Sequence, residues 1–306
     1  MIKVTVPATT ANLGPGFDAM GMALSQYSVF ECEESDKIEL IIEGLESEKL
    51  TVEDNLVIKC MNKVFDYIGD YPKGYKLKII NGIPLARGMG SSASAIIGGI
   101  MCANALMDFP LSSDEVLNLA TELEGHPDNV APALLGNLIV STKTKDNEII
   151  FRSIELFEDM ECVLFIPDYE VSTKDSREVL PEKISMEDAV HNSSHLALLV
   201  LAFLNKDKTL IGKTMDDRIH EPYRKSLIRN FDDFREAAIS SGAFAFSLSG
   251  AGSTIIAYSD EENSEKVKEA FEDIAKKEAI SGKAIVIKPS NKGAICEINW
   301  GEYRWE

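Results

Sequence analysis

The stretch IPLARGMGSSASAIIGGIMCANAL, residues 83–106, decides how this chain is interpreted. It follows the alternating segment YKLKII, and it places Gly88-Met89-Gly90 and several serines before a run of small and apolar residues of helical length. A helix N-terminus carries unpaired N–H groups and the positive end of the helix dipole, so it binds anions. Glycines allow a close approach and positive φ, and hydroxyls add ligands for phosphate or magnesium. The order of these residues predicts a phosphate loop that opens a buried helix.

The loop differs from the common nucleotide-binding patterns. No lysine follows its second glycine as in a Walker A loop, and its spacing is not GxGxxG. For this segment taken alone, a glycine-rich turn that caps a helix without binding a ligand is the alternative. The remaining motifs of the chain therefore have to decide between the two interpretations.

Composition narrows the class of protein. The 306 residues are 45% hydrophobic and 26% charged, which is typical of a globular protein with two domains. The net charge of −19 excludes nucleic acid and anionic membranes as expected partners, and an anionic ligand must be met by local cations, amides or a metal ion. Five scattered cysteines without a CxxC pair predict reduced thiols. The absence of a signal-peptide core and of a membrane-length apolar run predicts a cytoplasmic protein.

The order of predicted elements indicates an α+β fold. Alternating apolar residues predict strands in IKVTV, KIELIIEG, YKLKII, ECVLFIP and TIIAYS. Helices are predicted over about residues 55–67, 113–124, 186–205 and 263–279, with each sheet covered by helices on one face. The polar stretch KTKDNEIIF marks the predicted boundary between a domain of residues 1–150 and one of residues 151–306.

Two polar loops carry further candidate residues. VPATTANLGPGFDAMGMAL, residues 6–24, holds Asn12 and Asp18 in a rigid loop; local Asx caps are the alternative explanation. ELEGHPDNVAPALLGN, residues 122–137, offers Glu122 or Glu124 as a carboxylate for magnesium, although a capped helix end is the alternative here.

Three later segments complete the set. VSTKDSREVLP and IHEPYRKSL each hold one arginine, Arg177 and Arg224, in a chain that is short of cations. An arginine fork binds a carboxylate through two hydrogen bonds, although each arginine taken alone also fits an exposed surface position. SLSGAGSTIIAYS places a glycine-rich turn between two short strands, for which an ordinary hairpin turn is the alternative.

Together these segments resemble the GHMP small-molecule kinases. PxxxGMGSSAS, residues 84–94, is similar to the central motif of that family, and SGAGST is similar to its C-terminal SGAGPT motif. PATTANLGPGFD and EGHPDNVAPALLG resemble the members that phosphorylate L-homoserine. Met89 and Ser253 replace the usual Leu and Pro, and neither change removes a chemical group. The resemblance covers nearly the whole chain.

The resemblance implies a fold, a reaction and partners. It implies a ribosomal-S5-domain-2-like N-terminal domain, a ferredoxin-like C-terminal domain and a homodimer. The implied reaction transfers the γ-phosphoryl group of MgATP to the side-chain hydroxyl of L-homoserine, giving O-phospho-L-homoserine for threonine synthesis. A kinase of another small alcohol such as mevalonate, which has no ammonium group for Asp18, and a non-catalytic nucleotide sensor are the alternatives.

The resemblance also implies roles for individual residues. The residues expected near the transferred phosphate are Glu124, His126, Asp128 and Asn129. Those expected to bind ATP are Pro84, Arg87, Gly88, Met89, Gly90, Ser91, Ser92, Ala93 and Ser94, with Asn55 on the adenine side. Those expected to bind homoserine are Asn12, Asp18, His126, Thr173, Arg177, Arg224, Gly250 and Gly252. Mg²⁺ is expected at Ser94 and Glu124. The amide at Asn129 motivates the hypothesis that no side-chain base exists and that the hydroxyl proton passes to the γ-phosphate.

Overall fold

Two β-sheets organise the computed structural model, which describes residues 1–51, 53–298 and 301–303. The eight-stranded sheet contains β1 (Ile2–Ala11), β2 (Met20–Glu34), β3 (Glu39–Gly44), β4 (Tyr75–Asn81), β5 (Leu138–Lys143), β6 (Ile149–Ile154), β11 (Ile295–Ile298) and β12 (Gly301–Tyr303). The four-stranded sheet contains β7 (Met160–Pro167), β8 (Ala245–Leu248), β9 (Ile255–Asp260) and β10 (Gly282–Ile287).

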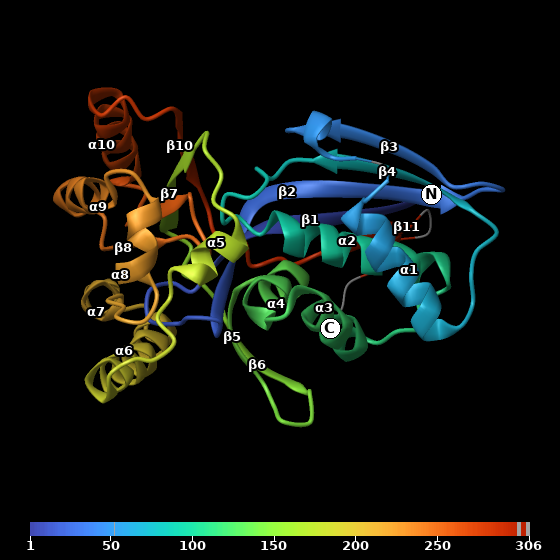
Figure 1. Ribbon diagram of the computed structural model, residues 1–306, viewed down its shortest axis with the longest axis horizontal. Helices are drawn as coiled ribbons and strands as arrows, with labels where there is room; N and C mark the ends of the chain where they lie inside the picture. Colours follow the sequence, from blue (N-terminus) through green and yellow to red (C-terminus); the bar gives the residue numbers. More distant parts are fainter. Residues whose placement is uncertain (52, 299–300, 304–306) are drawn as a thin grey trace.

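The helices divide between these sheets (Figure 1). Those beside the larger sheet are α1 (Leu56–Ile68), α2 (Ser91–Leu106), α3 (Ser113–Glu124) and α4 (Pro127–Leu135). Those in the other half are α5 (Thr173–Glu178), α6 (Met186–Leu204), α7 (Lys208–Thr214), α8 (Glu221–Arg224), α9 (Phe231–Ser240) and α10 (Ser264–Lys277). Two short 3₁₀ turns span Ser47–Lys49 and Lys225–Leu227.

The helix α2 is the centre of the first layer. It is buried along most of its length, as its small and apolar composition predicted, and it packs against α1 and the β1–β2 pair. Its glycines make this approach possible. A Cβ on Gly98 would lie 2.4 Å from the Phe30 ring, and one on Gly99 would lie 2.6 Å from the Val57 carbonyl oxygen. The tight packing fixes the direction in which the N-terminus of α2 points.

The smaller sheet has the strand order β10-β7-β9-β8, with every pair antiparallel. In this order the first strand of the unit, β7, lies between the last two, as in a ferredoxin-like fold. The helices α9 and α10 cover it, and a cluster of phenylalanines fills the space beneath them. Phe234 stacks on Phe165 at 4.8 Å between ring centroids and meets Phe271 edge-on at 5.4 Å.

The sheets do not separate at residue 150, where we predicted the domain boundary. The strand β6 crosses that position and pairs with β5, while β11 returns from the end of the chain to pair with β1 through Ile2↔Ile298 to Thr5↔Ile295. The polar stretch before β6 is therefore the turn of a hairpin. The first sheet needs residues from both ends of the sequence, which a single cut cannot represent.

Two further predictions concern the cysteines and membranes. All five cysteines are free and buried, as expected for reduced thiols. Within the described residues, no helix combines the length and the apolar character that crossing a bilayer requires.

Candidate active site

A cavity of about 290 Å³ lies where loops from both halves of the chain meet. The loop after β1, the start of α2, the α3–α4 turn, the start of α5 and the turn after β8 all reach it. Its lining residues are Asn12, Asp18, Ala86, Gly88, Gly90, Ser91, Ser92, Glu124, His126, Asp128, Asn129, Val171, Ser172, Thr173, Arg177, Arg224, Gly250 and Ala251. Segments that lie far apart in the sequence, and that we identified separately, therefore line one cavity.

The glycine loop opens α2 toward this cavity. Gly88 and Gly90 have φ of +73° and +68°, and Gly90 is the N-cap of the helix. The first regular helical bond runs from the Ser94 N–H to the Gly90 carbonyl at 2.9 Å. The N–H groups of residues 91–93 therefore form the open end of the helix, which is the arrangement that binds an anion.

The turn after β8 lies directly behind this loop. Ser249 Oγ donates to the Gly88 carbonyl at 2.6 Å, and the Gly250 N–H donates to the Ala11 carbonyl at 3.1 Å. A Cβ on Gly88 would lie 2.0 Å from the Ser249 carbonyl oxygen. Glycine at position 88 is thus required twice, for its positive φ and for the close contact between the two halves.

We expect Gly88→Ala to lower the free energy of unfolding by more than about 2 kcal/mol, because left-handed strain and displacement of the Ser249 backbone add together. Gly69→Ala is the matched control. Gly69 has a similar φ of +76°, but nothing lies within 4 Å of a Cβ there, so only the strain remains. Chemical denaturation of both variants measures the difference. Equal losses of stability would show that the contact with Ser249 contributes nothing.

The serine that meets the predicted magnesium carboxylate is Ser92. Its Oγ donates to Glu124 Oε2 at 2.8 Å, and both residues line the cavity. Ser94, which we predicted for this role, is 1% exposed, and its hydroxyl has no hydrogen-bond partner among the described residues. Two residues correspond to about 200° around a helix, so Ser94 faces the core when Ser92 faces the cavity. Ser92, and not Ser94, is therefore the serine whose hydroxyl lies beside Glu124.

Of the two glutamates near the end of α3, only Glu124 lines this cavity. Glu124 ends α3 at the cavity, whereas Glu122 has a 64% exposed side chain and pairs with Lys63 at 3.0 Å. Burial raises the pKa of Glu124 above its ordinary value, although the Ser92 hydrogen bond and the charge of His126 oppose this effect. A half-buried carboxylate with an elevated pKa favours a bound cation.

His126, Asp128 and Asn129 form a connected group at the start of α4. His126 Nδ1 contacts Asp128 Oδ1, Asn129 Nδ2 donates to the same oxygen at 3.4 Å, and Thr9 Oγ1 donates to Asn129 Oδ1 at 2.7 Å. Burial lowers the pKa of His126, but the hydrogen bond and charge of Asp128 outweigh it, so the net pKa is raised. The contact with Asp128 therefore orients the His126 ring and stabilises its protonated form.

Asp18 and Arg177 face each other across the cavity. Arg177 Nη2 donates to Asp18 Oδ1 at 2.9 Å, and Nη1 donates to Oδ2 at 3.1 Å. The Asp18 N–H donates to Asn12 Oδ1 at 3.1 Å, and Asn12 Nδ2 donates to the Gly250 carbonyl at 3.1 Å. The amide of Asn12 therefore positions the acidic loop against the turn after β8.

Arg224 is the second arginine of the site. It is 2% exposed, and its Nε and Nη1 donate to the Ser176 and Gly250 carbonyls at 3.0 and 3.2 Å. Burial, together with the charge of Arg177, lowers its pKa to about 10. The guanidinium groups of Arg224 and Arg177 lie 5.0 and 5.6 Å from the centroid of the Phe17 ring.

Sequence analysis missed the residues that support this group. His220 is fully buried, stacks on Phe17 at 5.1 Å and places Nε2 2.8 Å from the Gly14 carbonyl, so it holds the loop after β1. Asp217 accepts from the His220 N–H at 2.8 Å. The signal that could have found His220 is its place in IHEPYR, four residues before Arg224.

Several residues that we predicted to bind ligands lie outside the cavity lining. Arg87 is buried, and it donates to the Pro167 and Asp168 carbonyls and to Glu46, so it joins the two halves of the chain. Asn55 caps α1 by accepting from the N–H groups of Val57 and Ile58. The remaining residues outside the lining are Pro84, Met89, Ala93, Ser94 and Gly252. The backbone of these residues shapes the loops, whereas their side chains do not line the cavity.

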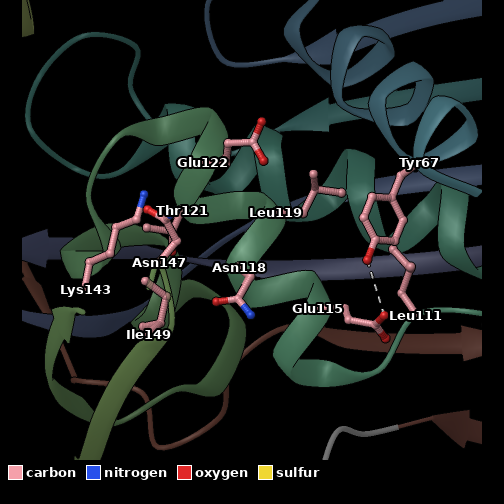
Figure 2. A pocket seen from close by; sticks show the side chains of 10 residues that line it. All are labelled: Tyr67, Leu111, Glu115, Asn118, Leu119, Thr121, Glu122, Lys143, Asn147 and Ile149. Atoms are coloured by element: carbon pink, nitrogen blue, oxygen red, sulfur yellow. Dashed lines mark hydrogen bonds between the residues drawn. The ribbon is translucent and has the colours of Figure 1, made fainter. Parts of the chain in front are cut away.

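A larger cavity of about 400 Å³ lies elsewhere, between α1, α3 and the β5–β6 hairpin (Figure 2). Glu122 is the one residue of the sequence motifs that lines it. Figure 2 shows Tyr67, whose hydroxyl donates to Glu115 at 3.5 Å, together with Lys143 and Asn147 on the hairpin. The loop at the start of α2, Arg177 and Arg224 line the other cavity.

Comparison with known proteins identifies the class to which this site belongs. Residues 55–137 match the family model of the GHMP kinases N terminal domain, and residues 199–277 match that of the GHMP kinases C terminal domain. The two matches cover the phosphate loop and much of the second half. The chain is a GHMP kinase, an ATP-dependent enzyme with a small-molecule substrate.

Relatives that match most of the chain show to which group of GHMP kinases it belongs. The chain is 42% identical over 302 residues to a homoserine kinase of Carboxydothermus hydrogenoformans, covering 98% of both proteins, and 46% identical to that of Moorella thermoacetica over 84% of this chain and 87% of the relative. The crystal structure of homoserine kinase from Cytophaga hutchinsonii superposes with a TM-score of 0.86 at 29% identity and 97% coverage of both chains. The chain belongs to the homoserine kinase family.

Proposed function

We propose that the cavity transfers the γ-phosphoryl group of ATP to the side-chain hydroxyl of L-homoserine, giving O-phospho-L-homoserine and ADP. One observation carries this proposal. The open N-terminus of α2 and the group of Asp18, Arg177 and Arg224 line the same cavity. The first is suited to the phosphates of a nucleotide, and the second is suited to the opposite charges of an amino acid.

The amino acid is held by its two charges. Asp18 supplies the carboxylate for its ammonium group, and Arg177 and Arg224 supply guanidinium groups for its carboxylate. Asp18 and Arg177 pair with each other at 2.9 Å, so the charge of each is balanced by the other. The bound amino acid replaces each partner with a group of the same charge, which limits the cost of opening the pair. Thr173 adds a hydroxyl at the start of α5.

The phosphates are held mainly by the backbone. The amides at the start of α2 and the hydroxyls of Ser91 and Ser92 face the cavity and meet negative charge in a chain of net charge −19. Glu124 and Ser92 fit a Mg²⁺ ion, because two oxygens 2.8 Å apart face the phosphate loop and burial disfavours an unpaired charge on Glu124. When bound, Mg²⁺ neutralises the phosphate charge that develops during transfer.

His126 acts as a cation near the transferred group. The hydrogen bond and charge of Asp128 raise the pKa of His126, and in its imidazolium form the ring stabilises phosphate charge and cannot accept the hydroxyl proton. Asp128 is committed to His126 and Asn129. The hydroxyl proton therefore passes to the γ-phosphate as the new P–O bond forms, and alignment supplies most of the rate enhancement.

The test is a coupled assay of ADP release from the purified chain with MgATP, in which L-homoserine, L-serine, L-threonine and mevalonate are offered separately. Turnover with homoserine far ahead of the others is expected. Faster turnover with mevalonate would overturn the assignment of Asp18 to an ammonium group. ATP binding without turnover on any alcohol would make the protein a nucleotide sensor.

We expect kcat/KM for homoserine to fall as pH rises through the pKa of His126, because the active form is protonated and its pKa is raised in the folded enzyme. Asp128→Asn removes the charge that raises this pKa, so the fall should begin at lower pH. Its kcat at neutral pH should drop by about 10-fold, less than the ~10²- to 10⁴-fold loss that follows removal of a general base. A loss of several orders of magnitude with unchanged substrate binding would make Asp128 the base.

A further inference from the structure

We infer that His191, His195 and Asp216 form a second metal site, which takes a transition-metal ion such as Zn²⁺ and lies apart from the ATP cavity. The two histidines stand four residues apart on α6, and Asp216 follows α7. One ligand atom from each of the three lies within 4.8 Å of the others. None of the three lines the catalytic cavity, and the inference does not rest on the proposed reaction.

The contact between His191 and Asp216 has the dimensions of two ligands of one ion. His191 Nε2 lies 3.0 Å from Asp216 Oδ2, yet this buried nitrogen has no hydrogen-bond partner among the described residues. Two ligands with bonds of about 2.0 to 2.1 Å to a tetrahedral or octahedral ion lie roughly 2.8 to 3.4 Å apart. The same contact is an ion pair when the His191 ring is protonated, and a shared cation would take the place of that proton.

One ring nitrogen of His195 has a hydrogen-bond partner in α6. Its Nδ1 lies 2.9 Å from the His191 carbonyl oxygen, one turn earlier in α6. A carbonyl oxygen only accepts, so Nδ1 donates this bond, and in the tautomer that carries its single proton on Nδ1 the lone pair of Nε2 is available to a metal. The two rings stack with centroids 3.7 Å apart, which puts both on one side of the helix. Histidines at positions i and i+4 are a recurrent pair of zinc ligands.

The donor set selects the class of ion. Two imidazoles and one carboxylate suit Zn²⁺, Co²⁺ or Ni²⁺, whereas Mg²⁺ prefers oxygen ligands. The five cysteines are all buried and offer no competing thiol site in the folded protein. The strong negative charge of the chain also concentrates cations at its surface.

A bound ion would join α6 to the turn that supports the substrate loop. Asn192 Nδ2 donates to Asp217 Oδ1 at 2.7 Å, and the Arg218 N–H donates to Asn192 Oδ1 at 2.9 Å. Asp217 in turn caps the His220 N–H. The ligands on either side, His191 and Asp216, would add a metal crosslink to this contact. The predicted role of the site is therefore structural.

The experiment measures Zn²⁺ and Co²⁺ binding to the metal-free full chain by equilibrium dialysis, and Tm with and without each ion. Asp18, His126 and Asp128 form another candidate cluster, so His126→Gln serves as the comparison variant. We expect Asp216→Asn and His191→Gln each to weaken binding by at least about 10-fold and to abolish the rise in Tm, while His126→Gln keeps one ion and the stabilisation. Mg²⁺ should not reproduce the effect.

Asp216→Asn protects the test from unfolding artefacts, because the side chain of Asp216 is 60% exposed and folding should not depend on it. Circular dichroism of this metal-free variant checks that point. If the wild type binds no Zn²⁺, or if Asp216→Asn and His191→Gln bind it as tightly as the wild type, the inference is wrong. If only His126→Gln loses the ion, the metal belongs to the catalytic cavity.

Discussion

Arg224→Lys is expected to raise KM for L-homoserine by about 30-fold or more and to leave KM for ATP nearly unchanged. Losing a buried, hydrogen-bonded charge partner costs about 2 to 5 kcal/mol, and about 1.4 kcal/mol corresponds to a factor of ten. Lysine keeps the charge but cannot hold the Ser176 and Gly250 carbonyls while presenting a fork to a carboxylate. Steady-state kinetics with each substrate varied in turn measures the effect.

The matched control is Arg218→Lys, six residues earlier. The Arg218 side chain is 42% exposed and pairs with Glu187 and Asp188 at 3.5 and 3.7 Å, outside the cavity. Arg218→Lys should leave KM for ATP and KM for homoserine unchanged. If Arg224→Lys raises KM for ATP as much as KM for homoserine while Tm stays constant, Arg224 belongs to the nucleotide side. An unchanged KM for homoserine would assign the carboxylate to Arg177 alone.

Local sequence patterns predicted the elements that carry the site. The order of glycine, serine and small residues predicted a buried helix where α2 lies, and the helix predicted over about residues 113–124 corresponds to α3. These features depend on neighbours in sequence, such as the capping box between Ser112 and Glu115. Resemblance to a family then brought together segments that composition alone left unrelated.

Local sequence patterns could not predict contacts between residues that are far apart in the sequence. The return of β11 to β1 joins the two ends of the chain, and no local pattern encodes that register. The role of Arg87 depends on carbonyls 80 and 81 residues away, and that of His220 on one 206 residues away. Ser92 and Ser94 are chemically identical, so only the rotation of α2 against Phe30 decides which one reaches Glu124.

Glu124→Gln is expected to lower kcat by about 10²- to 10³-fold and to raise the Mg²⁺ concentration needed for half-maximal rate, because the amide removes the charge that binds the ion. Glu122→Gln is the control, since Glu122 lies two residues earlier on the same helix and pairs with Lys63 at the surface. Initial rates over a series of Mg²⁺ concentrations at fixed ATP compare the two variants.

The raised pKa of Glu124 gives this prediction a second measurement. A carboxyl group with a raised pKa is protonated at higher pH than usual, so activity that needs its ionised form is lost as pH falls through that pKa. Mg²⁺ favours the ionised form, so higher Mg²⁺ should move the acidic limb of the pH–rate profile to lower pH. Glu124→Gln should abolish this movement, whereas Glu122→Gln should retain it. If the acidic limb of the wild-type pH–rate profile does not move with Mg²⁺ concentration, Glu124 is not a ligand of the metal ion.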